Sequence, residues 1–197
     1  MTSLFLDTSS NTLIISIVKN SKIIDIISLE EAREHSIYAV EKLKKIIENN
    51  NLTPDDIDKI FVVNGPGSFT GIRIGVTIAK TYAYALNKKI VPVSSLKMKI
   101  LGYNNYDNYI SIMKDKKDLS YLGIYDKNYN TLFEGLLTEA DIKEKIENIK
   151  GKNKIVKFEL DDSNRENIDI VSIINYYNNI NEVNPHNVNP NYLKEVI

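Results

Sequence analysis

Residues 64–75 read Asn-Gly-Pro-Gly-Ser-Phe-Thr-Gly-Ile-Arg-Ile-Gly, and the rest of the chain is organised around this stretch. It follows a short apolar run at 60–63 that has the pattern of a buried strand. It leads into an apolar stretch at 72–86 that is long enough for a helix. Glycines at 65, 67 and 71 permit positive φ and close approach of other backbone. The sequence therefore predicts a strand, a tight glycine turn and a helix.

This turn has two possible roles. Ser68 or Thr70 can cap the following helix, and the unpaired N–H groups at a helix start can bind an anion. The spacing is not the dinucleotide pattern G-x-G-x-x-G, because the third glycine falls one residue late, and no Gly-Lys-Ser/Thr follows as in a P-loop. We favour a turn that lets helix and strand pack closely, and we keep a phosphate site as the alternative.

Composition narrows the function classes. The chain has 197 residues, enough for one large domain or two small ones, and a net charge of −1. That charge argues against tight nucleic-acid binding by this chain alone. It has no cysteine and two histidines, which excludes disulfides and argues against a zinc site. No apolar run approaches the roughly 20 residues of a membrane span, and no signal peptide is expected, so we predict a cytoplasmic protein.

The first half of the chain predicts one lobe of a known architecture. Strands are expected at 4–7, 12–18 and 22–29, followed by a helix at 34–49. After the 60–63 strand and the 72–86 helix, we expect a strand at 90–93 and a helix at 96–101. An antiparallel meander followed by alternating helices and strands is the order of a ribonuclease-H-like or actin-like lobe. We assign residues 1–102 to this lobe.

The second half predicts a smaller lobe that covers residues 103–197. Its expected strands are 109–113, 119–125, 131–137 and 155–158, and its expected helices are 138–149 and 168–177. Residues 184–197 contain two prolines and little periodicity, which predicts a tail.

Two single residues are candidates for chemistry. Asp7 ends the first expected strand, where it can bind a metal or accept hydrogen bonds from the turn at 8–11, and we favour the turn role. His35 opens the first long helix without an evident partner, so we expect a surface residue. The predicted sets of catalytic, cofactor-binding and metal-binding residues are therefore empty.

The helix at 72–86 is apolar almost all round, which predicts burial on more than one side. One small lobe offers a single sheet, so the other side needs another helix or a second chain, and we expect a partner there. The expected patch joins the two long helices and would be exposed in a monomer. Its members are Val40, Leu43, Ile47, Val76, Ala79, Ala83 and Leu86.

Residues 65–75, Gly-Pro-Gly-Ser-Phe-Thr-Gly-Ile-Arg-Ile-Gly, resemble the signature of the TsaB family, formerly called YeaZ. Shorter matches lie along the chain. These are Asp7-Thr8-Ser9, His35-Ser36, Ala79-Lys80, Val93-Ser94-Ser95-Leu96 and Pro190-Asn191-Tyr192-Leu193-Lys194. The resemblance covers residues 1–100 well, whereas the second half departs from the family pattern. The resemblance therefore assigns no function to the second half.

The resemblance implies a two-lobed actin-like ATPase (ASKHA) fold with a reduced second lobe. It also implies a non-catalytic subunit that supports the TsaD transferase in tRNA threonylcarbamoyladenosine synthesis. TsaD carries metal-binding histidines where this chain has residues 94–99, and none of those six is histidine. Further implied partners are the TsaE ATPase and tRNA, reached through the complex. Independently of the resemblance, the exposed patch predicts that a second copy of the chain binds when the chain is alone.

In this interpretation five residues of the motif shape the turn and bind no cofactor. They are Gly65, Gly67, Gly71, Arg73 and Gly75. The alternative function is an active ATP-dependent transferase or kinase of the actin-like superfamily.

Overall fold

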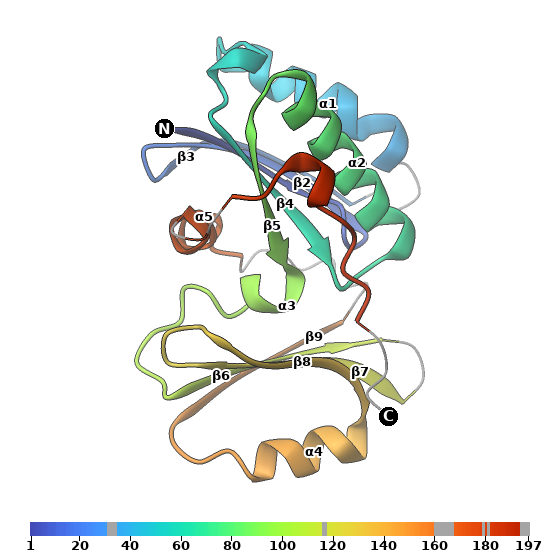
Figure 1. The fold of residues 1–197 in the computed structure, drawn as a ribbon, viewed down its shortest axis with the longest axis vertical. Coiled ribbons are helices and arrows are strands. Elements are labelled where there is room, and N and C mark those ends of the chain that lie inside the picture. The colour runs from blue at the N-terminus through green and yellow to red at the C-terminus, as the bar shows by residue number, and fades with distance from the viewer. Residues whose placement is uncertain (31–34, 116–117, 160–167, 179, 181, 194–197) are drawn as a thin grey trace.

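The computed structural model describes residues 1–30, 35–115, 118–159, 168–178, 180 and 182–193. Two β-sheets lie one above the other, with helices on their outer faces and between them (Figure 1). Short turns join the antiparallel strands, whereas helices join parallel ones, because a parallel pair needs a long crossover.

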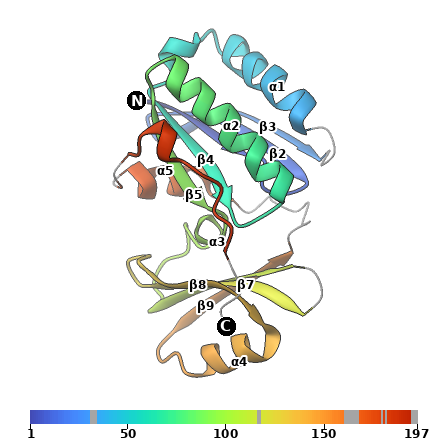
Figure 2. The same cartoon turned by 45° about the vertical axis from the view of Figure 1, so that its right-hand side comes forward.

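The first sheet has five strands in the order β3-β2-β1-β4-β5, of which β1, β4 and β5 are parallel. The strands are β1 Thr2–Asp7, β2 Thr12–Lys19, β3 Lys22–Glu30, β4 Lys59–Gly65 and β5 Lys89–Ser94. Two helices, α1 His35–Asn49 and α2 Phe69–Ala85, form the crossovers and pack on one face of this sheet (Figure 2). A short 3-10 turn, η1 Pro54–Asp56, leads into β4.

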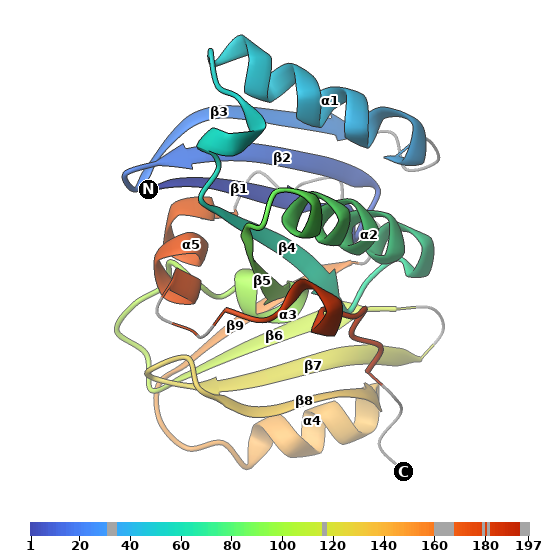
Figure 3. The same ribbon diagram turned by 45° about the horizontal axis from the view of Figure 1, so that its top comes forward.

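The second sheet has four strands in the order β8-β7-β6-β9, of which β6 and β9 are parallel. The strands are β6 Asn108–Lys114, β7 Leu119–Asp126, β8 Thr131–Thr138 and β9 Asn153–Glu159. Helix α4 (Glu139–Glu147) covers its outer face (Figure 3). Two helices, α3 Ser95–Met98 and α5 Ile170–Asn178, contribute to the core between the sheets, and a second 3-10 turn is η2 Pro185–Asn187.

Three apolar clusters hold these layers together. One lies between the first sheet and helices α1 and α2, and a second joins the facing sides of the two sheets through α3 and α5. A small third cluster lies between the second sheet and α4. Because the middle cluster draws residues from both halves of the chain, the two sheets share a core.

The predicted order of elements is confirmed, and so is the α/β class. The differences are small: α2 begins at Phe69 instead of Ile72, and α3 ends at Met98 instead of Leu101. Ser68 is the N-cap of α2, because its side chain accepts a hydrogen bond from the N–H of Gly71. The predicted helix start at Glu34 lies outside the described residues.

The prediction that residues 184–197 form a tail is wrong for residues 184–193, which continue a packed segment that begins at residue 182. This segment returns to the first sheet, where the N–H of Val183 donates to the carbonyl of Ile90 over 3.2 Å. Val188 is 2% exposed and belongs to the cluster beneath α2. Single anchors and isolated backbone hydrogen bonds leave no periodicity in a sequence, so pattern analysis misses such a segment. The domain boundary at residue 102 stays a prediction.

Candidate functional site

The glycine turn lies between the end of β4 and the start of α2, directly against the loop that follows β1. An ideal Cβ on Gly71 would lie 2.0 Å from the carbonyl oxygen of Thr8, and one on Gly67 would lie 2.4 Å from that of Ser9. A Cβ on Gly75 would lie 2.3 Å from the hydroxyl oxygen of Thr8. None of these three glycines has positive φ. Glycine is therefore needed at these positions because Thr8 and Ser9 lie too close to leave room for a Cβ, and not because of the backbone conformation.

Hydrogen bonds tie this loop to the helix. The N–H of Ser68 donates to the carbonyl of Ser9 over 2.8 Å, and the hydroxyl of Thr8 donates to the carbonyl of Gly71 over 2.7 Å. Asp7 is fully buried and accepts from both the N–H and the hydroxyl of Ser9, at 2.8 and 2.7 Å. The predicted turn role of Asp7 is confirmed. The N–H groups of Ser68 and Gly71, which an anion cradle would use, donate to the protein's own oxygens.

The C-terminal segment contacts the same turn. The N–H of Asn191 donates to the carbonyl of Asn64 over 2.7 Å, and a Cβ on Gly65 would lie 2.5 Å from the carbonyl oxygen of Asn191. Gly65 also has φ +124°, which disfavours any side chain there. From the other side, the hydroxyl of Ser95 donates to the carbonyl of Pro66. Motif stretches that lie far apart in the sequence therefore meet at this turn.

Arg73 joins the turn to the C-terminal segment at the surface. Its Nε donates to the hydroxyl of Tyr192 over 2.8 Å, and its guanidinium lies 3.8 Å from the centre of the Phe69 ring. The rings of Phe69 and Tyr192 stack with centroids 5.1 Å apart. The arginine thus bridges two aromatic side chains, an arrangement that lysine would not reproduce.

The prediction that an apolar patch on α1 and α2 is exposed is wrong for most of the residues in it. Five of the seven are buried in the first lobe's own core: Leu43, Ile47, Val76, Ala79 and Ala83. Leu86 is partly exposed, and Val40 is 58% exposed. The physical reason is that α1 and the segment around Val188 cover the sides of α2 that the sheet leaves open. Whether these helices bind a partner stays a prediction.

An apolar groove of about 530 Å³ remains on this side of the molecule, beside α1. Val40, Leu43 and Ile47 line it together with Leu52 and Tyr82. The hydroxyl of Tyr82 donates to the carbonyl of Pro54 over 3.0 Å. Burial, followed by the charges of two nearby aspartates, raises the pKa of Tyr82 to about 12, so its hydroxyl stays protonated.

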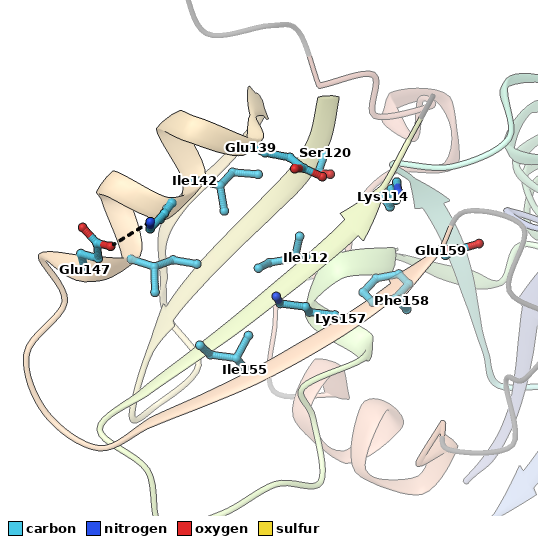
Figure 4. A pocket seen from close by; sticks show the side chains of 12 residues that line it. Ile112, Lys114, Ser120, Glu139, Ile142, Glu147, Ile155, Lys157, Phe158 and Glu159 are labelled. Atoms are coloured by element: carbon cyan, nitrogen blue, oxygen red, sulfur yellow. Dashed lines mark ion pairs between the residues drawn. The ribbon is translucent and has the colours of Figure 1, made fainter. Parts of the chain in front are cut away.

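A second pocket, of about 640 Å³, lies on the outer face of the second sheet beside α4 (Figure 4). Ile112 and Ile155 from the strands face Ile142 of the helix across it. Its charged groups are mixed in sign, and Lys143 and Glu147 pair with each other over 3.9 Å.

A polar cluster between the two sheets was not predicted from the sequence. Lys97 is 8% exposed, and its ammonium lies 5.2 Å from the centre of the Tyr125 ring. Burial lowers the pKa of Lys97, while nearby Glu134 opposes that shift. Glu134 accepts from the hydroxyls of Tyr125 and Ser94 over 2.7 and 3.0 Å. These groups lie between the sheets, where Glu134 joins Tyr125 and Ser94, and the ammonium of Lys97 donates to the hydroxyl of Tyr176 over 3.3 Å.

The sequence carries no signal for this cluster, because its members come from β5, α3, β7 and β8. The side chain of His35 lies outside what the structure describes. Among the described residues, no three His, Cys, Asp or Glu side chains lie close enough to hold a metal ion. In the same residues, no helix is both long enough and apolar enough to cross a membrane.

Comparison with known proteins gives three kinds of match. The family model described as TsaD, tRNA N6-adenosine threonylcarbamoyltransferase, matches residues 22–113. The tRNA threonylcarbamoyladenosine biosynthesis protein TsaB of Bacillus subtilis is 34% identical over 161 residues, which cover 80% of this chain and 70% of that protein.

An uncharacterized protein of Mycoplasma genitalium, MG208, is 29% identical over 202 residues, covering 98% of this chain and 95% of that protein. Among solved structures, YeaZ from Pseudomonas aeruginosa superimposes with a TM-score of 0.73 at 18% identity, over 98% of this chain and 99% of that one. At this identity the structural match shows a common fold.

Proposed function

Because the chain belongs to the TsaB family of tRNA threonylcarbamoyladenosine biosynthesis proteins, we propose that it is the non-catalytic partner subunit of the TsaD transferase. Its fold is the actin-like ATPase (ASKHA) α/β fold that YeaZ also has. The observation that carries the proposal is the 34% identity to a TsaB protein across 80% of this chain.

Two features of the structure support a role without catalysis. At the glycine turn, the carbonyl of Ser9 and the hydroxyl of Ser68 accept from N–H groups that a nucleotide phosphate would otherwise use. Between the sheets, the ammonium of Lys97 lies over the Tyr125 ring, and Glu134 accepts from the hydroxyl of Tyr125, so the polar groups there have partners within the protein.

The proposed partner surface is the exposed side of α1 with the groove beside it. Ile37 and Val40 project from α1 with 63% and 58% of their surface exposed. Leu52 and Tyr82 form the far side of the groove. Apolar side chains gathered at a groove suit the helix of a partner, and TsaD would supply helices equivalent to α1 and α2. A second copy of the chain would bind the same surface when TsaD is absent.

The remaining partners follow from this role. TsaE and tRNA would reach the chain through the complex with TsaD, and the location that this function implies is the cytoplasm. The alternative, an active ATP-dependent transferase or kinase, predicts binding of ATP with magnesium. Calorimetric titration of the chain with ATP and magnesium separates the two, because our proposal predicts no heat of specific binding.

The partnership is tested by co-purification of TsaD with the tagged chain. Val40→Arg places a charge at the proposed interface while leaving the core unchanged, so we expect a folded variant that retains no TsaD. Lys45→Glu, on an exposed side of the same helix, is the control and should retain TsaD. If folded Val40→Arg still co-purified with TsaD, the interface would lie elsewhere. Failure of the unaltered chain to co-purify with TsaD would contradict the proposed function itself.

A further inference from the structure

Three connections meet at one end of the second sheet and line an open, shallow pocket of about 410 Å³. They are the loop before β6, the turn between β7 and β8, and the residues before β9. We call it the Tyr106 pocket. The residues that carry the argument are Asn105, Tyr106, Lys127, Asn128, Tyr129 and Lys152. Its volume falls within the range of about 300–1,000 Å³ found for small-ligand sites.

The tyrosine rings in this pocket are held in place by one another. The ring of Tyr109 stacks on Tyr129 with centroids 4.8 Å apart, and the ring of Tyr106 meets Tyr109 edge to face at 5.9 Å. Tyr129 also donates its hydroxyl to the side-chain oxygen of Asn104 over 3.2 Å. A ring fixed in this way is a surface on which a flat base can stack with little loss of side-chain entropy.

Positive charge gathers at the same place. The ammonium of Lys152 lies 4.7 Å from the centre of the Tyr106 ring. Outside the pocket lining, the ammonium of Lys154 on β9 lies 4.1 Å from the centre of the Tyr103 ring. Lys127 is exposed on the turn between β7 and β8. Among the described residues, none of these three lysines forms an ion pair with a carboxylate. Their charges therefore remain available to an anion.

The nearby carboxylates serve the loops that shape the pocket. Asp107, which is itself one of the residues that line the pocket, accepts from the N–H of Lys152 over 2.7 Å. Asp126 accepts from the side chain and N–H of Asn130 and from the N–H of Asn128, at 2.8–2.9 Å, and these bonds lower its pKa. The amide side chains of Asn105 and Asn128 are exposed beside the rings, where they can donate to and accept from a base edge.

We propose that the Tyr106 pocket binds one nucleotide of single-stranded RNA, with the base against Tyr106, the phosphate at Lys127 and Lys152, and the base edge at the asparagines. The proposal rests on the proposed function, in which that RNA is tRNA. Rings, ammonium groups and amides are the combination that recognises unpaired nucleotides. The loops lie on the side of the molecule opposite the glycine turn and away from α1 and α2 (Figures 1 and 3). A partner on α1 would therefore leave the pocket open.

The test measures binding of a labelled single-stranded oligoribonucleotide to the full chain by fluorescence anisotropy at low salt. Lys127→Glu with Lys152→Glu should weaken binding at least tenfold. The slope of log K against log salt should become shallower by about 0.7, since the two lysines share one phosphate and each phosphate contact on a single strand contributes about 0.7. Lys45→Glu with Lys143→Glu makes the same change in net charge far from the pocket and should leave that slope unchanged. Tyr106→Leu should weaken binding about tenfold or more through lost stacking.

Three outcomes would overturn the proposal. The first is equal weakening by the two double variants, which would show that only net charge matters. The second is binding of duplex RNA or of free adenosine monophosphate as tightly as the single strand. The third is that no variant changes the affinity.

A parallel assay of tRNA modification with TsaD separates this proposal from the proposed function. If the unaltered chain supports modification and the Lys127→Glu, Lys152→Glu variant does so at an unchanged KM for tRNA, the pocket assignment is wrong and the function stands. If that variant raises the KM for tRNA while kcat is kept, the pocket assignment is supported. If the unaltered chain supports no modification, the proposed function fails whatever the oligonucleotide shows.

Discussion

Gly71→Ala tests the packing role of the glycine turn most clearly. The clash that we expect there and the usual effect of replacing glycine by alanine change the stability in opposite directions. Replacing glycine by alanine at a compatible position usually stabilises a protein by about 0.4–1 kcal/mol. Here the new Cβ would lie 2.0 Å from the backbone oxygen of Thr8, which cannot rotate away. We therefore expect the opposite sign, because the start of α2 must separate from the loop after β1.

The magnitude follows from two contributions. Overpacking a buried site costs about 1–3 kcal/mol. The displacement also strains two hydrogen bonds, from Ser68 to Ser9 and from Thr8 to Gly71, each of which contributes about 0.5–1.5 kcal/mol. We expect the free energy of unfolding to fall by about 2–4 kcal/mol. At about 2–4 °C per kcal/mol for a chain of this size, Tm should fall by about 4–16 °C.

Gly75→Ala supplies a matched test, because its obstacle is a side-chain oxygen instead of backbone. Its Cβ would lie 2.3 Å from the hydroxyl oxygen of Thr8, and the next atom is 3.5 Å away, at ordinary contact distance. In a Thr8→Ala background the Gly75→Ala cost should therefore nearly vanish, giving a coupling energy of about 1–3 kcal/mol. Gly71→Ala should retain most of its cost in that background.

Urea denaturation followed by circular dichroism measures all of these variants. Thr81→Ala, at an exposed position of α2, is the control and should change stability by less than about 0.5 kcal/mol. A Gly71→Ala variant as stable as the parent, or more stable, would refute the close-approach argument. A variant that kept its Tm but lost ATP binding would favour a phosphate site at the turn.

Three further predictions concern other parts of the fold. Ala83→Arg should unfold the first lobe, because Ala83 is 0% exposed and an unpaired charge is strongly disfavoured there; native circular dichroism would contradict this. Val188→Ala should lower the free energy of unfolding by about 1–3 kcal/mol in urea titrations, whereas a tail without contacts would show no change. Hydrogen bonds from Lys89 and Lys59 hold the pKa of Glu182 below its ordinary value of 4.5. The two ion pairs of Glu182 therefore stabilise the protein fully above pH 4.5, and this stabilisation is lost as the pH falls through the lowered pKa of the folded state. Glu182→Gln should therefore be less stable than the parent near pH 7 and equally stable in strong acid. A difference in the free energy of unfolding that persisted in strong acid would argue against the ion pairs.

The glycine turn shows what the sequence can predict. Strand, turn and capped helix are each specified within residues 60–86, so local pattern suffices to find them. The packing role of the glycines can also be predicted locally, because it depends only on the absence of a Cβ at those positions. The atoms that Gly67 and Gly71 approach belong to the loop after β1, however, and no pattern near the glycines identifies them.

Helix α2 shows where sequence reasoning stops. Its apolar sides correctly predicted burial on more than one face, but the sequence does not say which element covers each face. A lobe with one sheet covers only one side of such a helix, which is why the sequence predicts a partner on the other side. In the structure, α1 and Val188 cover those sides, and Val188 lies in a stretch without periodicity. Lys97 is a similar case, because its burial depends on rings from strands and helices far along the chain.

The central claim is that this chain supports a transferase and is not one itself. The direct measurement is nucleoside mass spectrometry after incubating unmodified tRNA and the threonylcarbamoyl adenylate donor with the purified chain, with TsaD, or with both. We predict no threonylcarbamoyladenosine from the chain alone, and more from both proteins together than from TsaD alone. Threonylcarbamoyladenosine formed by the chain with TsaD rigorously absent, or TsaD activity that is indifferent to the chain, would contradict the account.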